Sequence, residues 1–189
     1  MTDPTLTFAT QEAWDAWLDQ HGSTSSGVWL RLAKKSASKA TVSYVDALEC
    51  ALCYGWIDGK KQSESAHYRL QRFTPRVARS IWSQINKEKS QALVASGRMR
   101  PAGLLQIQRA KDDGRWEAAY APASSSTVPD DLQRALDAHP KAAEFFATLN
   151  SRNRYAILFR VHNAKKPETR ARKIAQFVDM LGKGEVPYP

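Results

Sequence analysis

The chain of 189 residues has little of several features that define common protein classes. It contains two cysteines, too few for the disulfide framework of small secreted domains, so a reducing compartment is expected. Its nine glycines and nine prolines show no period, which excludes a collagen-like repeat. No stretch approaches the roughly 20 apolar residues that cross a bilayer, and the first residues do not form a signal peptide. We therefore expect a soluble, cytoplasmic protein with no membrane insertion.

Motifs for metal, nucleotide and catalytic chemistry are also missing. The four histidines follow no zinc-binding or catalytic spacing, and no glycine-rich phosphate loop or dinucleotide fingerprint is present. Cys50 and Cys53 form a CxxC pair, but it lies late in an apolar helical pattern and has no second pair, so we expect structural thiols. Asp58 and His67 are the acid/base candidates, and nothing places them together. We predict no catalytic residue, metal or cofactor, and we rank an enzyme last.

Positive charge is the first informative feature that is present. Lys and Arg number 28 against 19 Asp and Glu, which gives a formal net charge of +9. The excess is uneven, because residues 1–57 carry −2, residues 58–115 carry +8 and residues 116–189 carry +3. A basic segment of this kind indicates either an anionic partner or a solvated face that keeps the protein in solution. Composition leaves both readings open.

Hydrophobic periodicity predicts an α+β fold with a small antiparallel sheet packed with helices, followed by a C-terminal bundle of short helices. Thr10 and Ser43 are placed to cap helices, and Pro75 ends the second strand of a pair. The expected strands are 28–33, 56–61 and 67–74, and the expected helices are 10–18, 43–55, 80–97, 101–110, 130–138, 140–149, 151–162 and 167–182. The capping box Thr127-x-x-Asp130 is expected to open the fifth of these helices. The expected domains are 1–119 and 130–189, joined by a linker over 120–129.

The densest run of aromatic and polar residues supplies a candidate ligand-binding site. Arginine offers a planar, bidentate fork for carboxylate or phosphate, and tryptophan can form the wall of a pocket. A helix N-terminus near Ser80 would add backbone donors for an anion. The alternative is a packed strand–helix corner with core tryptophans and an Asp58–Arg ion pair. The candidate residues are Trp56, Asp58, Arg72, Arg76, Ser80, Trp82 and Asn86.

Several segments resemble the YdeI/OmpD-associated family. They include residues 51–59 (ALCYGWIDG), 72–76 (RFTPR), 80–83 (SIWS) and 164–170 (AKKPETR), and the resemblance runs in order over almost the whole chain. It implies a small cytoplasmic bacterial protein, linked by name to bacteriocin protection and stress tolerance. It implies no catalytic residue and no cofactor.

Two kinds of partner follow from these observations. The first hypothesis is a non-enzymatic protein that binds a small anionic ligand or an acidic protein in a basic, Trp-lined pocket. The second is a nucleic-acid-binding protein that uses the basic middle segment and the arginines of the tail helices. For that tail we favour a solvated face, with Arg152 and Arg160 opposite Tyr155 and Phe159. The oligomeric state stays open.

Overall fold

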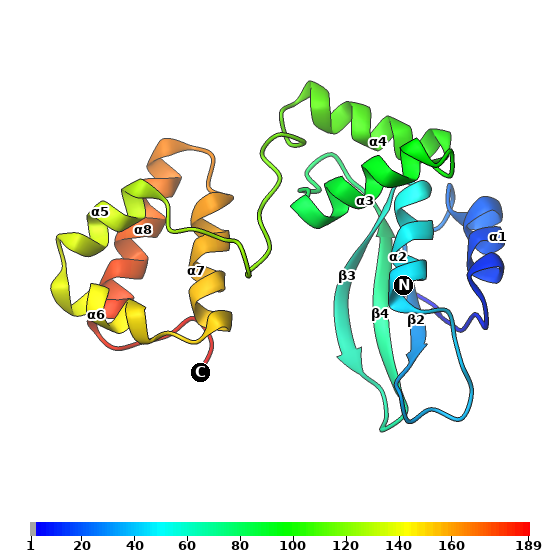
Figure 1. Ribbon diagram of the computed structural model, residues 1–189, viewed down its shortest axis with the longest axis horizontal. Coiled ribbons are helices and arrows are strands. Elements are labelled where there is room, and N and C mark those ends of the chain that lie inside the picture. Colours follow the sequence, from blue (N-terminus) through cyan, green and yellow to red (C-terminus); the bar gives the residue numbers. More distant parts are fainter. Residues whose placement is uncertain (1–2) are drawn as a thin grey trace. The chain divides into compact units, whose positions relative to one another are not determined.

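A computed structural model describes residues 3–189 of the chain (Figure 1). The chain divides into two compact units, unit 1 up to Ala119 and unit 2 from Tyr120. Unit 1 contains the sheet and four helices, and unit 2 contains four helices. The α+β class predicted from the sequence is confirmed.

Unit 1 is built around one four-stranded sheet in the order β1-β2-β4-β3. β2 pairs antiparallel with β4, and β4 pairs antiparallel with β3, as the predicted strand pair requires. β1 is parallel to β2, so the sheet is mixed rather than antiparallel throughout. A two-residue strand gives no periodic signal that sequence reasoning could detect. The strands are β1 (Thr5–Leu6), β2 (Val28–Ala33), β3 (Trp56–Ser63) and β4 (Tyr68–Pro75).

The helices of unit 1 are α1 (Gln11–His21), α2 (Tyr44–Cys53), α3 (Gln84–Ala95) and α4 (Pro101–Asp112). Thr10 caps α1 by accepting the Ala13 N–H at 3.3 Å, and Ser43 caps α2 by accepting the Asp46 N–H at 3.1 Å. Both caps are the ones the sequence predicts, because a hydroxyl before the first turn satisfies an otherwise free backbone donor.

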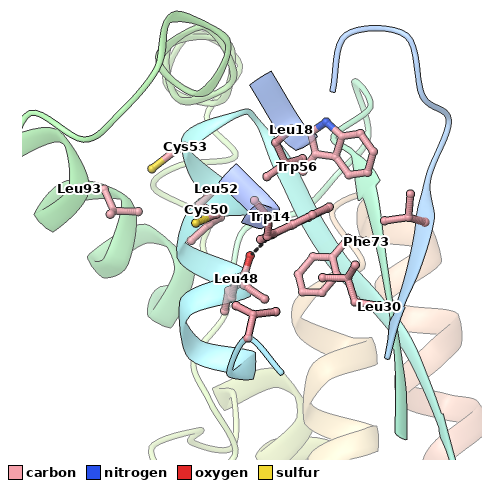
Figure 2. Close-up of a cluster of buried hydrophobic side chains, with 14 of the residues drawn as sticks. Trp14, Leu18, Leu30, Leu48, Cys50, Leu52, Cys53, Trp56, Phe73 and Leu93 are labelled. Carbon is pink, nitrogen blue, oxygen red and sulfur yellow. Dashed lines mark hydrogen bonds between the residues drawn. The ribbon is translucent and has the colours of Figure 1, made fainter. Parts of the chain in front are cut away.

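The core of unit 1 lies where α1 and α2 meet the sheet (Figure 2). β2 alternates between buried and half-buried positions, so Val28, Leu30 and Leu32 enter the core. The fully buried ring of Trp14 packs edge-on against Trp56 at 6.4 Å between ring centroids. Its indole N–H donates to the Ala47 carbonyl at 3.1 Å, so this large side chain is buried without leaving a polar atom unpaired.

Unit 2 packs its helices around a second, separate core. The helices are α5 (Asp130–Asp137), α6 (Pro140–Thr148), α7 (Ser151–His162) and α8 (Pro167–Gly182). Pro140 and Pro167 occupy the first positions of α6 and α8, as predicted, because proline lacks an N–H that the first turn would leave unpaired. The largest fully buried side chains are Leu132, Leu136, Ile157, Val161 and Leu181.

Two local predictions are wrong. The helix expected from Ser80 begins at Gln84, with Ser83 as its cap. The capping box at Thr127 does not form, because Pro129 is the N-cap residue of α5 and makes no side-chain cap bond. At α3 both Ser80 and Ser83 carry a hydroxyl able to cap a helix, and Ser83 is the one that accepts a first-turn N–H, from Asn86.

Candidate functional site

Four of the seven predicted site residues gather where β4 ends and α3 begins; we call Arg76, Ser80, Trp82 and Asn86 the β4–α3 corner. Arg76 follows β4 directly, and its guanidinium lies 3.6 Å from the centroid of the Trp82 ring. One guanidinium nitrogen donates to the Ile81 carbonyl at 3.2 Å. Arg76 and Trp82 are 5% and 3% exposed, so their contact is a buried cation–π pair.

Ser80 and Asn86 contribute to this corner through local backbone structure. The Ser80 hydroxyl accepts the Val77 N–H at 3.0 Å, and its carbonyl accepts a bond from Arg115 at 2.7 Å. Asn86 is buried, and its backbone N–H donates to the capping hydroxyl of Ser83. The helix start expected near Ser80 therefore lies three residues later, at Ser83.

The indole N–H of Trp82 is a buried donor of the β4–α3 corner that finds no acceptor among residues 3–189. Its ring packs edge-on against Trp116, with 4.8 Å between centroids. An unpaired buried donor costs on the order of 1–3 kcal/mol unless a water or ligand accepts its hydrogen.

The other three predicted residues have their partners outside the β4–α3 corner. Trp56 lies in the core, and its indole N–H donates to the Gly22 carbonyl at 3.0 Å. Asp58 accepts the Tyr44 hydroxyl at 2.8 Å, and Arg72 forms an ion pair with Asp3 at 2.6 Å. The seven residues thus do not converge on one place, and their role in ligand binding stays a prediction.

Unit 2 holds a pocket of about 440 Å³ that sequence reasoning did not identify. Arg152 and Arg160 both make cation–π contacts with one ring, and their guanidinium carbons lie 4.5 and 5.3 Å from the Tyr188 centroid. Tyr120 meets Phe159 edge-on at 4.8 Å. We call this the Tyr–Arg pocket, and its lining residues are Tyr120, Ala123, Ser151, Arg152, Tyr155, Ala156, Phe159, Arg160 and Tyr188.

The periodicity of α7 explains why these side chains share the Tyr–Arg pocket. At 100° per residue, Arg152, Tyr155, Phe159 and Arg160 fall within an arc of about 140°. The fully buried Val161 lies on the other side of the helix, in the core of unit 2. The prediction that the two arginines lie opposite Tyr155 and Phe159 is therefore wrong. Plotting the residues on a helical wheel would have revealed this face.

The side-chain amide of Asn153 holds Tyr188 in the Tyr–Arg pocket by bonding to both backbone polar groups of that residue. The buried amide of Asn153 donates to the Tyr188 carbonyl at 3.0 Å and accepts the Tyr188 N–H at 2.9 Å. Because Asn153 and Tyr188 are 35 residues apart, no local pattern could predict this contact. The backbone of Tyr188 is thus fixed by Asn153, and its hydroxyl accepts a hydrogen bond from Arg160 at 3.1 Å.

The electrostatics of the Tyr–Arg pocket favour an anion. None of its nine lining residues is Asp or Glu, whereas two are arginines. Burial, with a smaller contribution from Tyr120, raises the pKa of Tyr155, so its phenol stays protonated at neutral pH and donates to the Ala121 carbonyl at 3.1 Å. The pocket therefore presents two positive charges beside neutral aromatic surfaces.

A polar cleft of about 540 Å³ in unit 1 has mixed charge instead. It lies beside α1 and α2 and is lined by carboxylates such as Asp15 as well as by Arg98 and Arg100. Arg98 forms an ion pair with Glu49 at 3.0 Å, so its positive charge is balanced by a carboxylate. Cys53 reaches its wall, and burial raises the pKa of that thiol, which makes it a poor nucleophile.

Residues 3–189 contain neither a candidate metal cluster nor a candidate membrane span. No group of three or more His, Cys, Asp or Glu side chains in this range is arranged to hold a metal ion. No helix within it is both long and apolar enough to cross a bilayer.

Comparison with protein families divides the chain in two. A family model described as "Domain of unknown function (DUF8412)" matches residues 6–106, just over half of the chain. A second model, described as "Bacteriocin-protection, YdeI or OmpD-Associated", matches residues 125–184. The predicted resemblance to the second family is confirmed, and its match lies in unit 2 rather than over the whole length. No curated protein matches the chain, and no solved structure does.

Proposed function

The chain belongs to the DUF8412 family, its unit 2 matches the YdeI/OmpD-associated family, and we propose that it is a non-enzymatic protein that binds a small anionic ligand. The name of the second family associates the protein with bacteriocin protection, and we propose anion binding as the molecular basis of that role. A part in stress tolerance and a cytoplasmic location belong to the same proposal. Two free, buried cysteines are compatible with a reducing compartment.

The observation that carries the proposal is the pairing of two guanidinium groups with aromatic walls in the Tyr–Arg pocket. A guanidinium group binds carboxylate or phosphate through two parallel hydrogen bonds, and an aromatic face accepts a flat apolar body. A ligand with both parts, such as an aromatic carboxylate or a nucleoside monophosphate, fits this chemistry. The aromatic wall of this pocket is tyrosine and phenylalanine in unit 2, whereas the tryptophans of the site predicted from the sequence are in unit 1.

Calorimetric titration with benzoate, adenosine monophosphate and inorganic phosphate tests the proposal. A charged hydrogen bond contributes about 1.5–3 kcal/mol, so Arg152→Ala and Arg160→Ala should each weaken binding by about 10- to 100-fold. Arg172→Ala removes the same charge from an exposed position of α8 outside the pocket and is the matched control. If the control loses as much affinity as the pocket variants, binding reflects net charge and the proposed site is wrong.

The same titrations test whether the β4–α3 corner binds an anion. Its support is the buried Trp82 donor, which a bound anion or water could satisfy. Arg76→Ala and Trp82→Ala should weaken anion binding if the corner holds the ligand. Lost stability with unchanged binding would assign these residues to packing.

Nucleic acid is the second candidate, and the same pocket supports it, because aromatic rings stack on bases and arginines meet phosphates. Binding of this kind loses about one unit of log affinity per log unit of salt for each phosphate neutralised. A gel-shift assay with a single-stranded oligonucleotide at two salt concentrations separates the two candidates. A steep salt dependence that Arg152→Ala reduces would favour nucleic acid over a small ligand.

A further inference from the structure

Unit 2 contains a second and larger concavity, of about 1160 Å³, which shares no lining residue with the Tyr–Arg pocket. It lies along α8, beside α5 and the start of α6, which are neighbours in Figure 1. Small and aliphatic side chains form most of its surface, so we call it the alanine groove. Its apolar lining residues include Ala135, Ala138, Ala171, Ile174, Ala175 and Val178.

The groove exists because the facing helices carry side chains too short to meet. Ala171 and Ala175 are one turn apart on α8, and Ala135 of α5 lines the same groove. The large residues of α5, Leu132 and Leu136, point into the core instead and are fully buried. The alanine methyls therefore remain as an exposed apolar floor, and such concave apolar surfaces are typical of ligand sites.

Charges along the edge of the alanine groove are nearly all paired. Arg170 bonds both oxygens of Asp131, at 2.5 and 2.8 Å, and Lys183 pairs with Asp179 at 2.7 Å. Lys141 is the exception, because it forms no ion pair with any carboxylate among residues 3–189. The groove thus combines an apolar floor with one uncompensated cation.

That cation lies toward one end of the groove. The Asp131–Arg170 pair joins the first turns of α5 and α8, so it marks the end where both helices begin. From Asp131, α5 runs about 9 Å to its last residue, Asp137, at 1.5 Å per residue, and Lys141 lies beyond that end, in the first turn of α6. An elongated ligand could therefore place an apolar chain on the alanines and one negative group beside Lys141.

We propose that the alanine groove binds an amphiphilic monoanion, a molecule with an unbranched apolar chain and a single carboxylate, of the medium-chain fatty acid class. Its carboxylate pairs with the Lys141 ammonium group, and its methylenes cover the floor formed by Ala171 and Ala175. A ligand with a single carboxylate is expected because Lys141 supplies a single positive charge that no carboxylate among residues 3–189 pairs with. The inference does not rest on the Tyr–Arg pocket and adds a second ligand class to the protein.

Calorimetry with the full chain and dodecanoate, below its micelle concentration, tests the groove. Burial of a methylene contributes about 0.8 kcal/mol, so affinity should rise by up to about fourfold for each methylene from octanoate to dodecanoate. Dodecyltrimethylammonium has the same chain and the opposite charge, and it should bind at least tenfold more weakly than dodecanoate. Equal affinity for the two would show that the apolar surface alone attracts them and would overturn the proposal.

Variants locate the binding. Ala175→Leu fills the floor at an exposed helical position and should weaken dodecanoate binding at least tenfold, while Ala147→Leu adds the same bulk on the exposed part of α6 outside the groove and should not. Lys141→Glu should also weaken it tenfold or more, whereas Lys173→Glu makes the same change of charge away from the groove. Circular dichroism verifies that each variant is folded. Full affinity in Ala175→Leu, or no binding of dodecanoate to the unmodified chain, would refute the site.

Discussion

Replacement of Asn153 by alanine tests how the Tyr–Arg pocket is assembled. The Asn153 amide makes two hydrogen bonds to the backbone of Tyr188, at 2.9 and 3.0 Å, and is 4% exposed. At about 0.5–1.5 kcal/mol each, the two bonds contribute about 1–3 kcal/mol. Tyr188 is 38% exposed and can bond to water once released, so we expect a loss in the lower half of that range. The freed ring would leave Arg152 and Arg160 without their cation–π partner.

Unit-specific probes make this prediction measurable. All six tryptophans lie at or before position 116, so their fluorescence reports unit 1, while circular dichroism reports the helices of both units. In urea, Asn153→Ala should move the unfolding transition of unit 2, followed by circular dichroism, to a lower urea concentration and leave the transition followed by tryptophan fluorescence unchanged. The affinity of the same variant for an anion should also fall. Asn163→Ala is the control, because this residue bonds to the Phe159 carbonyl and does not contact Tyr188. Unchanged affinity in Asn153→Ala, or equal losses in both variants, would refute the assembly we describe.

Three further predictions concern stability and reactivity. Gly103→Ala should destabilise unit 1 by about 1–3 kcal/mol in urea, because its methyl would lie 2.4 Å from the Cys53 carbonyl, whereas at Gly59 the nearest atom is 3.8 Å away and the same change should cost nothing. Bonds from Arg170 lower the pKa of Asp131, so the stability from this pair is present above about pH 4, the ordinary value, and is lost as pH falls further; Asp131→Asn should remove that pH dependence from unit 2 melts. Burial raises the pKa of Cys50 to about 11, so iodoacetamide should modify this thiol at pH 8 only after unfolding, and fast labelling of the native chain would contradict its burial.

Local sequence signals predicted the elements of the fold where one residue decides the outcome. Thr10 and Ser43 cap the first two long helices, and Pro140 and Pro167 open two later ones, because each acts on backbone groups within a few residues. β1 could not be predicted, since its two residues gain their structure from parallel pairing with β2, more than 20 positions away. Such a contact depends on the assembled sheet and leaves no periodic pattern.

The candidate site was harder to predict for the same reason. The stacking of Arg76 on Trp82 joins residues six positions apart, and the sequence placed them together correctly. The Tyr–Arg pocket needs Tyr188 beside Arg152 and Arg160, and a buried Asn153 amide makes that long-range contact. Periodicity could show which face of α7 carries the arginines, but not what covers it.

Charge distribution along the sequence suggests an anionic partner for the basic segment 58–115. In the structure, several of the cations of this segment already have carboxylate partners. Four cations of residues 58–115 pair with carboxylates of the acidic first 57 residues; the pairs are Arg72–Asp3, Lys89–Glu49, Arg98–Glu49 and Arg100–Asp15. Ion pairs at or near the surface add about 0–1 kcal/mol each to stability, but they lower the positive potential around unit 1. An anion binding there would compete with carboxylates already in place. In the Tyr–Arg pocket it meets two guanidinium groups and no lining carboxylate, so unit 2 is where charge favours a ligand.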